Sequence, residues 1–192
     1  MNILLPNEFN ESKLKFSKID QEAIHHQIYF YPTYDNNPFI FQTEEIKITQ
    51  YGIPSLGDFY KDDQQRSFIK VPIDKNQINC IELKNFLEKL DTFIINNKTN
   101  IIGIYDSSSE LTPSVKQPYD PSLDEEDNED NKIIYQNKME YCKLKFNLDY
   151  QDKFVKTSVF LNQNNQKVII NKSNFSISDI CEHFLLVLVL KR

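Results

Sequence analysis

The sequence is poor in several residue types on which whole classes of protein depend. Its 192 residues include no tryptophan, three glycines, three cysteines and a single alanine, Ala23. So little alanine disfavours a mainly helical protein, whereas the abundant Ile, Val, Phe and Tyr favour strands. The length suits one large domain or two small ones, and either can bury a real core.

The cysteines and histidines are too scattered to predict a metal site or a disulfide framework. Cys80, Cys142 and Cys181 are far apart, odd in number and without a CxxC pair, so we expect reduced thiols inside a cell. The adjacent His25 and His26 have no cysteine nearby, and a metal needs more ligands than they supply. No metal and no cofactor is therefore expected.

Neither a targeting segment nor a membrane span is expected. The first twelve residues, MNILLPNEFNES, lack the basic start of a signal peptide. Residues 184–190 are apolar throughout, but seven residues are too few to cross a bilayer. We expect a soluble intracellular protein.

The acidic charge is concentrated in one tract. Residues 120–131, DPSLDEEDNEDN, hold seven acids and no base, whereas residues 132–192 hold ten bases and five acids. Such segregation is common in proteins that handle nucleic acid, and also in proteins that need a soluble linker. With three prolines nearby, residues 106–131 are predicted to form a disordered insertion. We expect the tract to dock partner proteins, or to occupy a basic surface of the same chain until a nucleic acid displaces it.

The pattern predicts a β-rich α+β fold with one long amphipathic helix. Asn79 is the expected N-cap of this helix. Its apolar positions recur at helical spacing: Leu83, Phe86, Leu87, Leu90, Phe93 and Ile94. Before the helix, a strand is expected over 28–31, and Pro32 should end it or mark a sheet edge. Further strands are expected over 39–42, 46–50 and 66–71, with turns at 35–38 and at Gly52-Ile53-Pro54. After it, a short strand is expected over 101–105.

The C-terminal third predicts a three-stranded meander. Apolar and polar residues alternate over 142–148 and 154–161, and a third strand is expected over 167–170. Ser176-Ile177-Ser178-Asp179 matches a capping box, which predicts a short helix. Residues 185–190 fit either a buried strand or a continuation of that helix. A strand there needs neighbours on both sides.

The stretch 42–72 carries the strongest functional pattern. A strand over 66–71 places Arg66, Phe68 and Lys70 on one face, where cations can pair with phosphates while the ring stacks on a base. The alternative is an ordinary strand whose Phe68 joins a core. The same reasoning gives these nucleic-acid-binding candidates: Tyr51, Tyr60, Lys61, Arg66, Phe68, Lys70, Lys143, Lys145, Lys156 and Phe160.

Taken in order, these segments resemble the single-stranded DNA-binding proteins of large DNA viruses. The resemblance covers about residues 28–190 and lies mainly in Gly52-Ile53-Pro54, in the group Tyr60, Asp63 and Arg66, and in Pro72 with Asp74. It implies an OB-fold-like, partly open antiparallel barrel over 28–192, preceded by a flexible or edge arm over 1–27. It also implies sequence-independent binding of single-stranded DNA at viral replication sites.

Two other functions are compatible with the sequence. A divalent-metal site for nucleic-acid cleavage could be formed by Asp58, Asp62 and Asp63 together with Asp74 or Glu82. No histidine-based or glycine-rich motif accompanies these acids. We therefore expect that the protein is not an enzyme. The second alternative is a viral structural or assembly protein that uses its β-domain for protein contacts.

Overall fold

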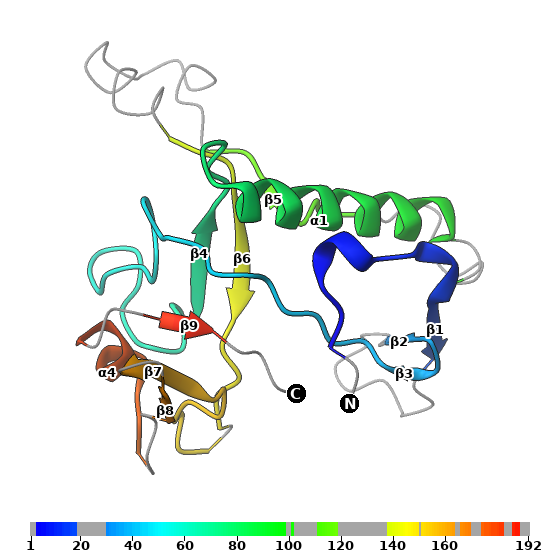
Figure 1. Cartoon of the computed structure of the whole chain (residues 1–192). Coiled ribbons are helices and arrows are strands. Elements are labelled where there is room, and N and C mark those ends of the chain that lie inside the picture. The colour runs from blue at the N-terminus through cyan, green and yellow to red at the C-terminus, as the bar shows by residue number, and fades with distance from the viewer. Residues whose placement is uncertain are drawn as a thin grey trace. The chain divides into compact units, whose positions relative to one another are not determined.

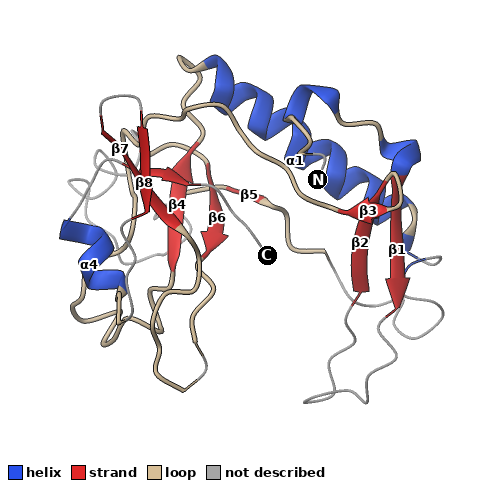
Figure 2. Ribbon diagram, turned by 60° about the horizontal axis from the view of Figure 1, so that its bottom comes forward, coloured by secondary structure: helices blue, strands red, loops and turns tan. Residues whose placement is uncertain are grey.

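The computed structural model describes residues 3–18, 30–98, 101, 111–118, 138–149, 151–163, 166–169, 174–182 and 186–188. These residues form a small α+β protein with one main helix and three three-stranded antiparallel sheets (Figures 1 and 2). The coarse fold class predicted from the sequence is confirmed, and the described residues form no closed barrel. Two compact units make up the chain: unit 1, Met1–Glu44 with Glu82–Ser114, and unit 2, Glu45–Ile81 with Val115–Arg192.

Unit 1 contains the sheet β1-β2-β3 after two short 3-10 turns, η1 (Pro6–Glu8) and η2 (Glu11–Lys13). Its strands are β1 (Leu14–Lys18), β2 (Phe30–Tyr34) and β3 (Asn37–Pro38). The predicted turn between β2 and β3 is confirmed: Asp35 and Asn36 have φ of 50° and 61°, as a two-residue hairpin turn requires. The N-terminal segment thus supplies an edge strand, and Pro32 lies inside β2 instead of ending it.

Helix α1 (Ile78–Asn96) has the apolar stripe predicted from its spacing. Leu83, Phe86 and Leu87 are buried, and the ring of Phe86 packs within unit 1 against those of Phe9, Phe39 and Phe41 at centroid distances of 5.1, 6.2 and 4.7 Å. The stripe therefore forms the core of unit 1.

The first sheet of unit 2 has the order β4-β6-β5, with β4 (Phe68–Pro72), β5 (Val115–Lys116) and β6 (Tyr141–Lys145). Ile69, Val71 and Cys142 are buried on one of its faces. Strand β4 begins two residues later than predicted.

The predicted strands over 39–42 and 46–50 are wrong. Phe41 makes a single bridge to Leu4. The backbone N–H and C=O of Lys47 bond to the side-chain amide of Gln77 at 2.8 and 2.9 Å. Asn79, expected to cap α1, donates its side-chain amide to the carbonyl of Glu45 at 2.7 Å. Around Lys47, side chains thus take the place of the partner strand that a ladder would need.

The second sheet of unit 2 has the order β8-β7-β9, with β7 (Val159–Gln163), β8 (Gln166–Ile169) and β9 (Leu186–Leu188). The meander prediction is wrong in its first strand, because β6 pairs with β4 and β5 and not with β7. The predicted turn over 149–153 is nevertheless present: the amide of Asp149 donates to the carbonyl of Phe154 at 2.7 Å, and Leu148 bridges Val155.

The C-terminal elements partly follow the prediction. Helix α4 (Ile177–Glu182) has its capping box: the amide and hydroxyl of Ser176 donate to Asp179 at 2.6 and 2.7 Å, and the amide of Asp179 donates back at 3.1 Å. Strand β9 confirms the strand alternative, but it is an edge strand and not a central one.

Several predictions fall on residues outside the described ranges. They are the acidic tract, the histidines and, apart from Ile101, the strand expected over 101–105. In the part of the chain that the structure describes, no helix has the length and apolar character needed to cross a membrane.

Candidate nucleic-acid interface

Cations and aromatic rings gather on the face of β4 and β6 opposite to the buried one. Alternation along both strands explains this, because Ile69, Val71 and Cys142 occupy the buried positions and leave the intervening residues on the other face. We call the following set the cationic-aromatic face: Tyr51, Tyr60, Phe68, Lys70, Lys138, Tyr141, Lys143 and Lys145. Its lysines come from two parts of unit 2 that are far apart in the sequence, namely β4 and the stretch from Lys138 to the end of β6.

The ladder between β4 and β6 sets the spacing of this face. Lys70 lies opposite Lys143, and Phe68 lies opposite Lys145. Tyr141 lies opposite Pro72. Lys70 and Lys143 thus occupy the middle level of the ladder, with Phe68 and Lys145 at one end and Tyr141 at the other.

Tyr51 is brought to the face by an unusual turn. Its φ is 68° and that of Gly52 is 81°, a left-handed conformation that costs a residue with a Cβ some strain. Two hydrogen bonds between Gly52 and Lys70, at 3.1 and 2.9 Å, fix the turn to the edge of β4. The Tyr51 hydroxyl donates to the carbonyl of Met139 at 2.6 Å, and its ring centroid is 5.1 Å from that of Tyr141. Burial raises the pKa of Tyr51, and Tyr141 raises it further, so the hydroxyl remains a donor.

The lysine ammonium groups rest on the rings. Lys70 Nζ is 4.9 Å from the ring centroid of Tyr141 and 5.7 Å from that of Tyr51. Lys138 Nζ is 5.5 Å from the Tyr51 centroid, and Lys143 Nζ is 4.7 Å from the Phe68 centroid. These are cation–π distances, each interaction worth about 0.5–1 kcal/mol at exposed sites.

No carboxylate neutralises these charges among the described residues. The ion pairs formed by those residues do not include Lys70, Lys138, Lys143 or Lys145. Burial lowers the pKa of Lys70, and the positive charges of Lys143 and Lys138 lower it further. An anion that binds here would therefore reduce the repulsion between the lysine ammonium groups.

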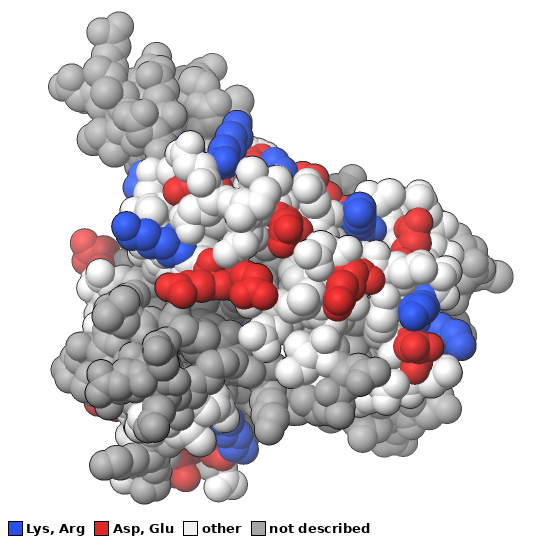
Figure 3. Space-filling view, viewed as in Figure 1, with Lys and Arg blue, Asp and Glu red and all other residues white. Residues whose placement is uncertain are grey.

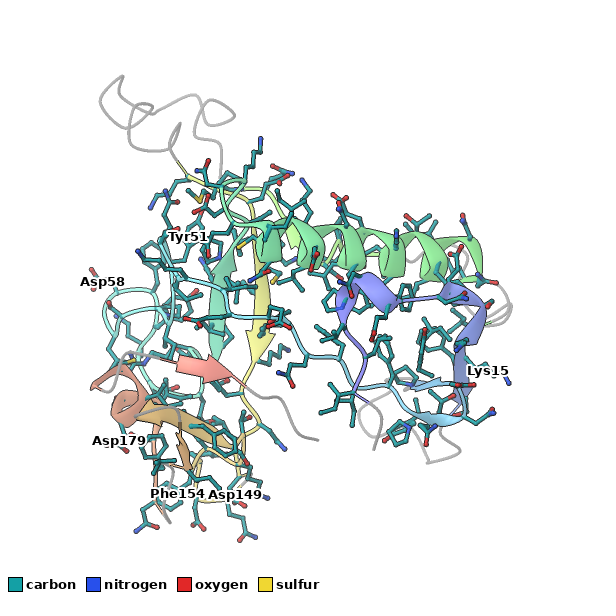
Figure 4. The ribbon with its side chains drawn as sticks, in the orientation of Figure 1. Lys15, Tyr51, Asp58, Asp149, Phe154 and Asp179 are labelled. Atoms are coloured by element: carbon teal, nitrogen blue, oxygen red, sulfur yellow. The ribbon has the colours of Figure 1, made fainter. Side chains whose placement is uncertain are left out.

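Tyr60 completes the opposite end of the face. Its ring meets that of Phe68 edge-on at 5.8 Å. The neighbouring Lys61 is exposed and pairs with Asp58 at 3.8 Å, and Asp58 lies on the outer loop of unit 2 in Figure 4. The structure places Lys61 beside the face and not within the ladder.

Arg66 is not on the cationic-aromatic face, and that prediction is wrong. It precedes β4, is only 5% exposed, and lies 2.7 Å from Asp63 Oδ1 in a salt bridge. Its guanidinium also donates to the carbonyl of Pro54 at 3.0 Å, to Ser178 Oγ at 2.7 Å and to Cys181 Sγ at 3.7 Å. Arg66 therefore fastens the loop before β4 to helix α4.

Lys156 and Phe160 are not brought together with the other candidates. Phe160 belongs to β7 in the second sheet. Lys156 forms a 2.8 Å ion pair with Asp149, which lies at the far end of unit 2 from Tyr51 (Figure 4). The Lys156 ammonium is the main reason that the pKa of Asp149 falls to about 2, helped by the amides of Asp152 and Gln151.

Sequence reasoning missed two members of the face. Tyr141 shares the alternation of Lys143 and Lys145 and was detectable by extending that pattern by one step. Lys138 precedes β6, and no local pattern points to it. The remaining candidates lie on the face or beside it as described above.

The acids proposed as a metal site have other partners. Asp63 pairs with Arg66, and Asp62 accepts hydrogen bonds from the amides of Gln64 and Gln65. The buried Asp74 accepts from Asn76 and Gln77, and these bonds lower its pKa. Within the described ranges, no three His, Cys, Asp or Glu side chains come close enough to hold a metal ion.

Acidic and basic side chains are interspersed on the side of the molecule seen in Figure 3.

The chain is similar to an uncharacterized protein of Acanthamoeba polyphaga mimivirus, with 28% identity over 89 residues. The match takes in 43% of this chain, which spans only 22% of the length of that curated relative. No family model matches the chain. No solved structure matches it either.

Proposed function

We propose that this protein binds single-stranded DNA without sequence preference through the cationic-aromatic face. The observation that carries the proposal is the arrangement of unpaired lysines directly on half-buried rings. Rings and cations interleaved in this way are the two components of single-strand binding, because bases stack on the rings while phosphates meet the cations.

Binding proceeds by exchange on each ring. Lys143 moves off Phe68, and Lys70 moves off Tyr141, as bases take their places and the ammonium groups turn to the phosphates. The lost cation–π contacts are weak, whereas stacking one base on an aromatic side chain is worth about 1–3 kcal/mol. The exchange is therefore favourable, and it does not depend on the identity of the base.

An OB-like, partly open barrel in unit 2 is part of the proposal. Its support is the continuation of β6 beyond Lys145. The amide of Phe146 donates to the carbonyl of Ser67 at 2.9 Å, and the amide of Lys156 donates to the carbonyl of Asn147 at 2.7 Å. The first bond continues the β4–β6 ladder, and the second joins the chain after β6 to the segment that leads into β7, as the wall of an open barrel would.

We place this activity in viral genome replication, within the family of single-stranded DNA-binding proteins of large DNA viruses. The support is the sequence resemblance together with the mimivirus source of the similar protein. Replication proteins that dock on the acidic tract belong to the same proposal, as does a location at replication sites inside the host cell. No catalytic step is part of it.

The test is an anisotropy titration of fluorescent dT20 at 50 and 200 mM salt. If the four lysines of the face each neutralise one phosphate, the logarithmic salt slope is about −2.8, and affinity falls about 50-fold between the two concentrations. Labelled dC20 should bind about as tightly. No binding at 50 mM salt contradicts the proposal and favours a structural or assembly protein. Magnesium-dependent loss of the strand would instead indicate a nuclease.

A further inference from the structure

The two ring pairs of the cationic-aromatic face lie at different levels of the β4–β6 ladder. Tyr51 and Tyr141 form one pair, at the level of Pro72, because Tyr141 is opposite Pro72. Tyr60 and Phe68 form the other pair, four residues away along β4. At the rise of an antiparallel strand, about 3.4 Å per residue, the two levels are about 14 Å apart.

Lys70 and Lys143 lie midway between the ring pairs. They are opposite each other in the ladder, two residues from each level and hence about 7 Å from each. A stacked strand in duplex DNA rises about 3.4 Å per nucleotide, and an extended, unstacked strand advances roughly twice as far. One nucleotide of an extended strand therefore matches the step from either ring pair to the lysines.

We propose that the face has a footprint of three nucleotides. The first and third bases stack on the two ring pairs, and the phosphates on either side of the middle nucleotide bind Lys70 and Lys143. This footprint rests on the proposed function and specifies its minimal ligand.

A competition titration measures the footprint. In it, unlabelled oligo-dT of one to eight nucleotides, without terminal phosphates, competes against labelled dT20 at 50 mM salt. Going from dT2 to dT3 should improve affinity about 5- to 150-fold, the range for one added base stacked on an aromatic side chain. Beyond dT3, further gains should come only from the phosphates that reach Lys138 and Lys145, so affinity should level off at dT5 and then rise only in proportion to the number of overlapping positions. Equal affinities for dT2 and dT3, or a steep rise that continues beyond dT5, overturn the footprint.

Two variants probe the two ends separately. Phe68→Leu should reduce the gain from dT2 to dT3, because only Tyr60 remains at that end, and Tyr141→Leu should do the same at the other end, where only Tyr51 remains. Tyr31→Leu removes an exposed ring of unit 1 and should leave the series unchanged. A loss by the same factor at every length in both face variants contradicts the assignment of the terminal bases. Circular dichroism melting shows that each variant is folded.

The failure of this inference differs from the failure of the proposed function. If dT20 binds and the affinity step falls elsewhere, the footprint is wrong and single-strand binding stands. If dT20 itself does not bind, both are wrong.

Discussion

Replacing Arg66 by alanine tests whether this residue supports the fold, as its burial indicates, or contacts DNA, as its sequence pattern predicted. The substitution removes the partner of Asp63 and leaves that carboxylate without its ion pair. It also takes a donor from Pro54, Ser178 and Cys181. Breaking a buried ion pair by deleting one partner costs about 3–5 kcal/mol. In a protein of this size we expect Tm to fall by about 6–20 °C.

Thermal and urea unfolding followed by circular dichroism measures this loss. Lys61→Ala is the matched control, since Lys61 is exposed and its 3.8 Å pair with Asp58 is worth little. Arg66→Lys should fall between the two variants, because lysine retains the charge but not the planar fork of donors. All three should be compared in dT20 affinity at a temperature at which each is fully folded.

The reasoning is refuted if Arg66→Ala melts within about 2 °C of Lys61→Ala while its affinity for dT20 falls. Arg66 would then be a surface residue that contacts DNA. A large fall in Tm with unchanged affinity of the folded protein is the expected result.

Other predictions concern stability in each unit. Asp149→Asn should flatten the dependence of Tm on pH: the Asp149 pKa is lowered from 3.8 to about 2 by Lys156, so its stabilisation is full above about pH 4 and is lost as the pH falls toward 2. Phe86→Ala should cost about 3–5 kcal/mol in urea unfolding, whereas Phe59→Ala, whose side chain is 92% exposed, should stay within about 0.5 kcal/mol. Ser176→Ala should cost about 1 kcal/mol by removing the cap of α4, and an unchanged urea midpoint would count against that cap.

The elements best predicted from the sequence were those specified by local pattern. The stripe that includes Leu83, Phe86 and Leu87 identified α1, since apolar residues at helical spacing over so long a stretch are typical of an amphipathic helix and of no strand. The capping box at Ser176 and the turn at Asp35 and Asn36 likewise depend only on residues near in sequence.

Strand pairing was predicted less well, because it depends on partners distant in the chain. Alternation identified β6, but its partner β4 lies about seventy residues earlier, and the neighbouring meander was the simpler expectation. The segment around Lys47 looked like a strand, yet its backbone bonds to the side chain of Gln77. No local pattern distinguishes an amide side chain from a partner strand.

The same distinction separates the candidate residues that share a face from those that do not. Phe68, Lys70, Lys143 and Lys145 were placed on common strand faces by alternation, and the register then brought the two strands together. Arg66 follows the same alternation, but Ser178, more than a hundred positions away in the sequence, helps to bury it. Contacts between residues far apart in the sequence thus determine which of these cations have an ion-pair partner among the described residues.

The central claim is that the unpaired lysines of the cationic-aromatic face bind the phosphates. The most direct test is the dT20 titration at 50 and 200 mM salt with the double variant Lys70→Gln/Lys143→Gln, beside Lys89→Gln, which removes an exposed cation of α1. The double variant should bind more weakly, and its affinity should fall only about 7-fold between the two salt concentrations, against about 50-fold for the wild type and Lys89→Gln. A double variant with the affinity and salt dependence of the wild type would contradict the account.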